Sequence, residues 1–347
     1  MPEAYRRKDA GIETLRGLAL LLMVTGHVIG SSSALGMQVP DDSLLRYLYD
    51  SLVYVRMPLF TAISGYVYAL RPVTPESRLP SFLRGKCYRI GIPLVVVTCL
   101  FFVAQLTIMG TNSTPVPSDF RHIFFYGYAH FWFLQALLII FLIIAIVDKA
   151  DLTSRFPFFL GFLIASVAVN ALLPMPITFF SFHRAVDLLP FFLLGMATCR
   201  FPGKFAIAKP KVLIPLAAAL FVAVHQVHLL TPLNIPASGL KAFGLGLGLC
   251  TIYTLIAYRF EFTPLSFLGR YAYEVYLFHV FGTAGARILL NAVGIYDSLP
   301  VFTLGLAAGL MLPIGLKLLA QQHALFDLML FGSNRMPIWP AKKPAGG

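Results

Sequence analysis

Apolar residues in this chain are gathered into long runs separated by short polar or proline-containing connections. A helix that crosses a bilayer needs roughly 20 mostly apolar residues. Ten runs approach or exceed that length, over residues 12–30, 46–70, 90–109, 129–147, 156–173, 185–200, 212–229, 239–257, 266–290 and 301–320. The pattern therefore predicts an all-α, polytopic membrane protein of about ten transmembrane helices.

The connections between the runs are too short to hold a soluble domain, and the longest, roughly 71–89, is basic. We expect one membrane-embedded domain over residues 1–347, with a short N-terminal segment 1–11 and a C-terminal tail 321–347. The fifth and sixth runs are separated only by "LPMPITFFSFHR", and the ninth is long enough to be tilted or broken. Glycines spaced for close helix packing occur in the eighth and tenth runs, at Gly244, Gly246, Gly248, Gly305 and Gly309.

Composition supports this class. Hydrophobic residues make up 58% of the chain and charged residues only 12%, about half the charged fraction of an ordinary soluble domain. The formal charge is +12. In a membrane protein such an excess is explained by the positive-inside rule, so we expect the bilayer, and no nucleic acid, as a partner.

The basic residues also predict an orientation. With the N-terminus inside, five fall in outer loops and helix ends: Arg46, Arg121, Arg184, Lys241 and Arg287. Eighteen fall in inner loops and termini: Arg6, Arg7, Lys8, Arg71, Arg78, Arg84, Lys86, Arg89, Lys149, Arg155, Arg200, Lys204, Lys209, Lys211, Arg259, Arg335, Lys342 and Lys343. This asymmetry predicts cytoplasmic termini in an inner, cytoplasmic membrane.

The first run could be a cleaved signal peptide beginning with "YRRKD" instead of a transmembrane helix. Three ionisable residues within the apolar stretch argue against it, as does the long apolar chain that follows. The four cysteines are far apart and form no metal-type pair, so we expect neither a metal site nor a disulfide.

The first run, "ETLRGLALLLMVTGHV", carries Glu13, Arg16 and His27. Arg16 and His27 are eleven residues apart, which places them about 20° past three full turns and about 16 Å apart along the axis. They therefore share one helix face, with Glu13 within one turn of Arg16. These residues also have a purely structural explanation, in which Glu13 and Arg16 form an interfacial ion pair and His27 makes a hydrogen-bonded helix contact. Ionisable groups inside a membrane more often mark a function.

The second run, "YVRMPLFTAISGY", places Arg56 near the midplane and Pro58 just after it. Proline breaks the helical hydrogen-bond ladder, which is tolerated beside a cavity. A buried arginine stays charged and needs an acidic partner or an anionic ligand. Asp187 and Glu274 are candidate partners, and a purely structural ion pair is the alternative.

Other polar side chains fall in the same membrane half. His130 in "YAHFWFLQALL" and His279 in "YAYEVYLFHV" could join His27 in one chamber. Trp132 could line that chamber or belong to an interfacial aromatic belt. At the opposite surface, Arg84, Lys86 and Arg89 form a cluster that suits a multiply anionic ligand. The positive-inside rule alone would also explain basic residues at a cytoplasmic surface.

Five motifs in order resemble the acyltransferase 3 family of ten-helix membrane O-acyltransferases. They are "IETLRGLALLLMVTGHV", "RMPLFTAISGYVYAL", "FLRGKCYRIGIP", "AHFWFLQALL" and "LGRYAYEVYLFHV", and together they extend over most of the chain. The sequence departs from the family pattern at Glu13, where Asp is more usual, at Ala272, where Ser is commoner, and at Lys86 and Tyr88 beside Arg89.

The resemblance implies transfer of an acyl group, usually acetyl, from cytoplasmic acyl-CoA to a hydroxyl of an envelope glycan or glycolipid, with no permanently bound cofactor. The implied catalytic residues are His27 as base, with Glu13, Arg56 and His279. Donor binding falls to Arg16, Arg84, Lys86 and Arg89, and acceptor binding to His130, Trp132, Asp187 and Glu274.

Two alternatives from other classes stay open at this point. A proton- or anion-coupled transporter would also place His, Arg and Glu at the midplane. A non-catalytic scaffold would leave the buried charges unexplained. The inner basic cluster favours an enzyme that uses acyl-CoA.

Overall fold

The computed structural model describes residues 9–205, 208–231 and 235–333, and within these ranges the regular structure is helical throughout. The larger helices are α1 (Ala10–Ile29), α2 (Leu44–Ser51), α3 (Arg56–Ala69), α4 (Leu79–Lys86), α5 (Ile92–Thr107), α7 (Trp132–Lys149), α8 (Phe156–Leu172), α9 (Phe182–Arg200), α11 (Ala208–Leu230), α12 (Ala237–Ala257), α13 (Thr263–Arg270), α14 (Ala272–Ala292), α15 (Ser298–Ala320) and α16 (Ala324–Phe331). The short helices are α6 (His122–Phe125) and α10 (Pro202–Phe205).

Within the described ranges, seven helical segments are long and apolar enough to cross a membrane: Ala10–Ile29, Leu79–Thr107, Trp132–Lys149, Phe179–Arg200, Val212–Leu230, Ala237–Ala257 and Ser298–Ala320. The other three predicted spans differ. The run 46–70 is divided into α2 and α3, the run 266–290 is divided at Tyr271 into α13 and α14, and α8 has only 17 residues. The all-α, multi-pass class is therefore confirmed, whereas the count of ten stays a prediction.

The connection predicted over 71–89 is mostly helix. α4 begins at Leu79 with Pro80 in its first turn, and a π-helical turn at Cys87–Gly91 joins it to α5. Proline is tolerated at a helix start, and Lys and Arg are good helix formers, so a basic composition did not exclude a helix here. The basic side chains therefore project from a rigid rod of 29 residues.

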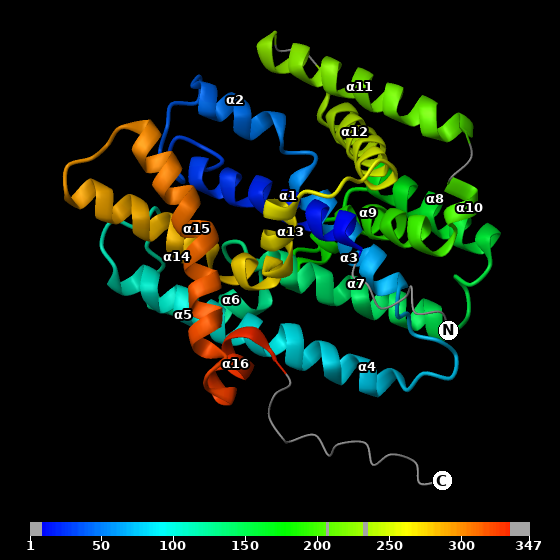
Figure 1. Cartoon of the computed structure of the whole chain (residues 1–347), viewed down its shortest axis with the longest axis horizontal. Helices are drawn as coiled ribbons and strands as arrows, with labels where there is room; N and C mark the ends of the chain where they lie inside the picture. Colours follow the sequence, from blue (N-terminus) through cyan, green and yellow to red (C-terminus); the bar gives the residue numbers. More distant parts are fainter. Residues whose placement is uncertain (1–8, 206–207, 232–234, 334–347) are drawn as a thin grey trace.

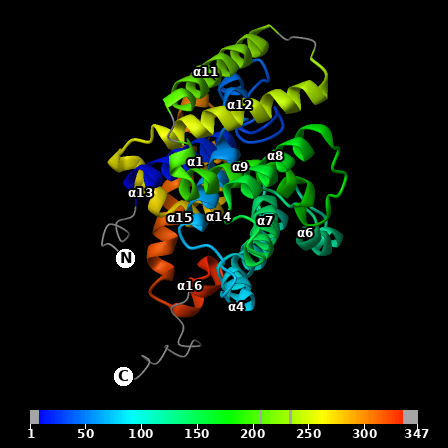
Figure 2. The same cartoon turned by 90° about the vertical axis from the view of Figure 1, so that its right-hand side faces the viewer.

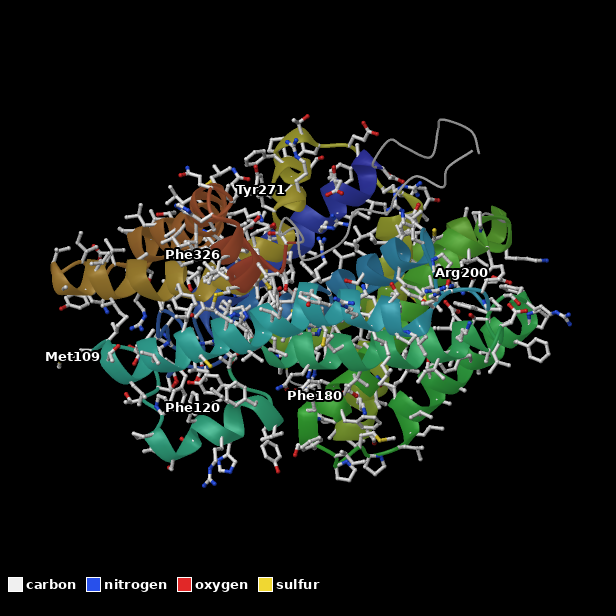
Figure 3. All side chains as sticks on the ribbon, turned by 90° about the horizontal axis from the view of Figure 1, so that it is seen from below. Met109, Phe120, Phe180, Arg200, Tyr271 and Phe326 are labelled. Carbon is white, nitrogen blue, oxygen red and sulfur yellow. The ribbon has the colours of Figure 1, made fainter. Side chains whose placement is uncertain are left out.

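The helices pack around α1, α3 and α9 (Figure 1). α11 and α12 lie together along one edge, and the second view shows α4 and α16 on the opposite edge (Figure 2). We distinguish two ends of the bundle, marked by Arg200 and Met109 in Figure 3. The end near Arg200, where α1 begins, is called the basic end. The end near Met109 is called the loop end.

Very close backbone approaches fix the central helices. A Cβ added at Gly17 on α1 would lie 1.8 Å from the carbonyl oxygen of Leu265 on α13, and one at Gly269 would lie 2.0 Å from that of Glu13. On α15, a Cβ at Gly309 would meet Thr283 of α14 at 2.6 Å. Glycine is required at such crossings because any side chain would separate the helices. These contacts hold α1, α13, α14 and α15 in a fixed register.

The basic end is fastened by a buried ionic cluster. Asp148 on α7 accepts hydrogen bonds from Arg200 of α9, at 2.9 and 2.5 Å, and from the hydroxyl of Tyr68 on α3, at 2.7 Å. Thr153 also donates to Asp148. A paired and fully hydrogen-bonded carboxylate avoids the large penalty of an isolated buried charge. The cluster therefore joins three central helices at one point.

Candidate active site

A cavity of about 680 Å³ opens toward the loop end of the bundle. Its wall is formed by α1, α3, α5 and α14, together with the start of α7 and the residues before it. His27, Arg56, His130 and Trp132 line it, as expected from the sequence for a shared chamber. The rest of the wall is largely apolar. This composition, an apolar cavity with a few convergent polar groups, is typical of a small-molecule site.

His27 lines the cavity from the last turn of α1. It is the only exposed residue of α1, all of which is described, and its neighbours Gly26 and Val28 are buried. α1 begins at Asp9, whose carboxylate caps the helix by accepting from the amide of Ile12, and it ends at Gly30. These ends place His27 in the last turn, with its imidazole free to meet a ligand.

His279 and His130 lie beside His27. The ring centroids of His27 and His279 are 4.7 Å apart, those of His130 and His279 are 4.8 Å apart, and those of His27 and His130 are 6.0 Å apart. The last turn of α1, the start of α7 and the middle of α14 thus bring three imidazoles together. His279 itself is fully buried behind the cavity wall.

Backbone carbonyls determine which nitrogen of each buried imidazole is protonated. Nδ1 of His279 lies 2.8 Å from the carbonyl oxygen of Tyr276, and Nε2 of His130 lies 3.3 Å from that of Leu277. A nitrogen facing a carbonyl must donate, so in the neutral ring the other nitrogen carries a lone pair. Those other nitrogens, Nε2 of His279 and Nδ1 of His130, are buried and without a hydrogen-bond partner among the described residues. The pair can therefore accept protons or hydrogen bonds.

Arg56 brings a positive charge to the same wall, and Asp50 is the carboxylate with which it interacts at longer range. It is the first residue of α3 and is 8% exposed. Its guanidinium lies over the ring of Tyr49, 3.9 Å from the centroid, and against Gly26 of α1. Among the described residues it forms neither an ion pair nor a hydrogen bond, so its donors are available to an anionic ligand.

The turn before α7 is strained where it enters the cavity. Ala129 has a φ of 46°, a left-handed conformation that costs an L-residue about 1–2 kcal/mol. The hydroxyl of Tyr276 donates to the carbonyl of His130 and fixes the next residue. Trp132 packs under the guanidinium of Arg184, 5.4 Å from the ring centroid. Strain of this kind persists where surrounding contacts enforce it, often at functional sites.

A cover closes part of the loop end. It is the segment 30–43, of which Leu35, Gly36 and Met37 line the cavity. Arg46 is 4% exposed and donates to the carbonyls of Gly30 and Val39, the latter at 3.4 Å. Asn112 donates to the carbonyl of Gly36 at 3.0 Å from the other side. The cover is thus held by side chains from two sides, and the amide of Met37 adds a hydrogen bond to the carbonyl of Val28 on α1 at 2.8 Å.

An aromatic floor closes the cavity toward the basic end. It consists of Phe60, Phe133 and Tyr276, with ring centroids 5.4–6.1 Å apart. Phe133 and Tyr276 are 1% exposed. Only Tyr276 of the three touches the cavity. The floor separates the three histidines from the basic end.

The four residues predicted to hold the donor all lie outside this cavity. Arg16 forms an ion pair with Glu13, with both carboxylate oxygens 3.0 Å from Nη1. Lys86 lies over the ring of Phe141 at 3.5 Å, and Arg84 lies over that of Tyr88 at 5.8 Å. Arg89 is exposed. These cations gather toward the basic end, as the sequence pattern predicted.

Asp187 and Glu274 do not pair with Arg56, contrary to the sequence-based interpretation. Asp187 forms an ion pair with Lys241 of α12 at 3.3 Å, and Glu274 lies near Lys317 and Arg89. Neither lines the cavity. Sequence could not show this, because both carboxylates lie on helices that pass close to the centre but face other neighbours. Their predicted role in acceptor binding has no support from the cavity.

Several cavity residues were not predicted as site residues from the sequence. Tyr49, Tyr276, Asn112 and Gln105 line the cavity, as does Arg287, which the sequence analysis counted only among outer helix-end charges. The sequence could have indicated that Arg287 lies near the site, because it follows His279 by eight residues and so lies about 80° from it around the helix. Within the described ranges, no group of three His, Cys, Asp or Glu side chains is arranged to hold a metal ion.

Comparison with known proteins identifies the family. Residues 9–318 match the acyltransferase 3 family model, which is described as an acyltransferase domain. The chain matches no curated protein and no solved structure. The match takes in every helix that lines the cavity, together with the basic helix α4. The chain therefore belongs to the acyltransferase 3 family and is a multi-pass membrane acyltransferase.

Proposed function

We propose that this enzyme moves an acyl group, acetyl in the simplest case, from acyl-CoA at the basic end to a hydroxyl of an envelope glycan or glycolipid in the cavity. The observation that carries the proposal is His27, the only exposed residue of α1, beside two buried imidazoles and a buried arginine that forms no ion pair within the described residues. The charge asymmetry of the sequence supports a cytoplasmic basic end and an inner-membrane location.

His27 acts as the general base. It takes the proton of the acceptor hydroxyl as the oxygen attacks the thioester carbonyl, so that a C–O bond forms. The C–S bond then breaks, and the imidazolium returns the proton to the departing thiolate. The products are an acyl ester and free coenzyme A. General-base catalysis of this kind typically contributes about 10²–10⁴ in rate.

Arg56 and His279 support the two charges that develop. The tetrahedral intermediate carries an oxyanion, and the free donors of Arg56 can stabilise it, because preorganised donors in a water-poor site need no rearrangement. The imidazolium of His27 forms next to the unpartnered Nε2 lone pair of His279. That lone pair is a suitable hydrogen-bond acceptor for the new N–H.

The donor is expected at α4. Coenzyme A carries several phosphate charges, and Arg84, Lys86 and Arg89 lie along one rigid helical rod with Arg16 at the same end of the bundle. The acyl group must then pass the aromatic floor to reach His27, so transfer requires Phe60, Phe133 or Tyr276 to move.

Substitution of His27 tests the proposal. We expect His27→Gln to lower acyl incorporation from labelled acyl-CoA into envelope glycan by at least 10²-fold, because an amide can form hydrogen bonds but cannot take the proton. The assay uses membranes with equal amounts of each variant. His122→Gln is the matched control, since His122 is an exposed histidine near the same end of the bundle. Near-normal transfer by His27→Gln would refute the assignment.

A further inference from the structure

The outermost part of the cavity contains a group of polar side chains. We call it the mouth and define it by Gln105, Asn112, Ser113 and Arg287. We infer that the mouth binds an anionic group of the acceptor, a carboxylate or phosphate on a sugar, through Arg287. This inference rests on the proposed function, since it specifies the class of acceptor that the cavity receives.

The charge of the cavity favours an anion. Arg56 and Arg287 both line it, and no aspartate or glutamate is found among the described residues of its wall. Each arginine is only 8% exposed. A guanidinium keeps its charge even when buried, so the two cations create a positive cavity whose apolar walls weaken the screening by water.

Arg287 has donors to spare. Its only hydrogen bond within the described residues is from Nη2 to the carbonyl oxygen of Gly110, at 2.8 Å. It forms no ion pair there either. A guanidinium offers five N–H donors, so most remain free for a ligand. Arginine binds carboxylates and phosphates through two parallel hydrogen bonds, which gives both strength and orientation.

The loop opposite Arg287 is built to hold it. Gly110 has a φ of 83°, and this turn presents its carbonyl to Arg287, while a Cβ added at Gly110 would lie 3.6 Å from the side chain of Ile288. The carbonyl contact orients one side of the guanidinium. The mouth therefore has a positioned cation, and an exposed loop arginine would lack this restraint.

Asn112 adds the second half of the site. Its Nδ2 donates to Gly36 of the cover, whereas its Oδ1 is buried without a hydrogen-bond partner among the described residues. A buried acceptor without a donor is costly, by about 1–3 kcal/mol. A sugar hydroxyl could supply the missing donor. An anion on Arg287 and a hydroxyl on Asn112 together describe an acidic or phosphorylated sugar.

The spacing along α14 indicates the size of the acceptor. Arg287 lies eight residues beyond His279, or about 12 Å along the helix axis. The hydroxyl that reacts and the anion that is recognised are therefore well separated. The acceptor class that fits is an acidic oligosaccharide, whose charged unit stays in the mouth while another unit reaches His27.

Binding to the full-length protein in phosphatidylcholine nanodiscs, without any acyl donor, tests the inference. The probes are a glucuronate-containing tetrasaccharide, its carboxyl-reduced form and inorganic phosphate, each followed by equilibrium dialysis. We expect the acidic tetrasaccharide to bind at least tenfold more tightly than the reduced form. R287Q should remove this preference, whereas R121Q, at an exposed arginine of a loop near the same end, should keep it.

A second variant distinguishes loss of the anion site from a folding defect in R287Q. N112D removes the donor to Gly36 and adds a negative charge beside Arg287, so we expect it to weaken binding of the acidic probe more than binding of the reduced probe, because only the acidic probe also meets charge repulsion. Equal binding of the two tetrasaccharides, or an unchanged preference in R287Q, would overturn the inference. So would inorganic phosphate binding as tightly as the acidic tetrasaccharide, which would indicate a site for free anions.

The result is independent of the chemical step. Selective binding that depends on Arg287 would stand even if acyl transfer were not detected in any glycan fraction, and that second outcome would refute the proposed function alone. Conversely, transfer to neutral glycans with no effect of R287Q would refute the mouth site and leave the proposed function intact.

Discussion

Gly26 links the two residues on which the proposed chemistry depends. A Cβ added here would lie 1.9 Å from Nη1 of Arg56, and Gly26 directly precedes His27. The obstructed atom is the end of a flexible side chain, so we expect Gly26→Ala to displace the guanidinium and leave the fold intact. The expected result is a loss of acyl transfer by about 10²-fold, the effect of losing one oxyanion donor.

The comparison needs a glycine at which added volume is harmless. Gly315 on α15 has no atom within 4 Å of an added Cβ. Gly315→Ala should therefore retain full activity and the same thermal midpoint in detergent. Normal turnover in Gly26→Ala would show that the position of Arg56 does not matter for the reaction.

Sequence alone located individual residues with mixed success. His27 was singled out because an imidazole in an apolar helix demands a reason. The structure places it in the cavity wall, and its catalytic role stays a prediction. The partner of Arg56 could not be predicted, because pairing depends on which side chains face each other across helices. The structure places the ring of Tyr49 against Arg56, and the carboxylate that interacts with Arg56 at longer range is that of Asp50. Arg287 was treated as a helix-end charge because its contact with Gly110 joins residues 177 positions apart.

At the scale of elements, the cover is expected to depend on Arg46. Arg46→Ala would leave the carbonyls of Gly30 and Val39 without their donor, at about 1–3 kcal/mol for each buried group. We expect a lower thermal midpoint and faster thiol labelling of a cysteine introduced by Leu35→Cys in a variant without the native cysteines. Arg121→Ala, at an exposed position, serves as the control. Unchanged labelling would show that the remaining contacts, from Asn112 to Gly36 and from the amide of Met37 to the carbonyl of Val28, hold the cover without Arg46.

A second prediction at the scale of elements concerns the basic helix α4. Replacing both Arg84 and Arg89 with Ala should weaken acyl-CoA binding to the purified protein, since each charge-assisted hydrogen bond to a phosphate contributes about 1.5–3 kcal/mol. Arg270→Ala is a suitable control, because Arg270 is an exposed cation at the end of α13. An unchanged affinity in the double variant would place the donor elsewhere.

Most helices could be predicted from hydropathy, but their interruptions could not. The run 46–70 is mostly apolar, and the chain leaves the helix between Ser51 and Arg56. The aromatic ring of Tyr54 packs there against Gly244 of α12, where a Cβ would lie 2.3 Å away. Pro58 signalled a break, but it lies in the first turn of α3, where proline is tolerated. Tertiary packing, which a hydropathy pattern does not contain, decides where the break occurs.

At the scale of the whole molecule, the orientation of the bundle follows from its charge asymmetry. Reporter fusions at Ser77, in the connection before α4, should read as cytoplasmic. Fusions at Asn112, beside the cavity, should read as outside the membrane. The two positions lie at opposite ends of the predicted topology, so each is the control for the other. A cytoplasmic signal at Asn112 together with an external one at Ser77 would reverse the direction of acyl flow.

The aromatic floor has a consequence for the cell that carries this enzyme. A bilayer stores energy as a proton gradient, and any continuous file of water through a protein would dissipate it. The cavity brings water as far as His27, a group that can pass protons onward, so the bundle comes within a few side chains of forming such a leak. Phe60, Phe133 and Tyr276 interrupt the water file with three aromatic rings packed edge-on or tilted against one another. If the donor binds at the basic end, as proposed, the acyl group must cross this seal at each turnover, and the speed at which the seal closes then matters to bioenergetics as well as to catalysis.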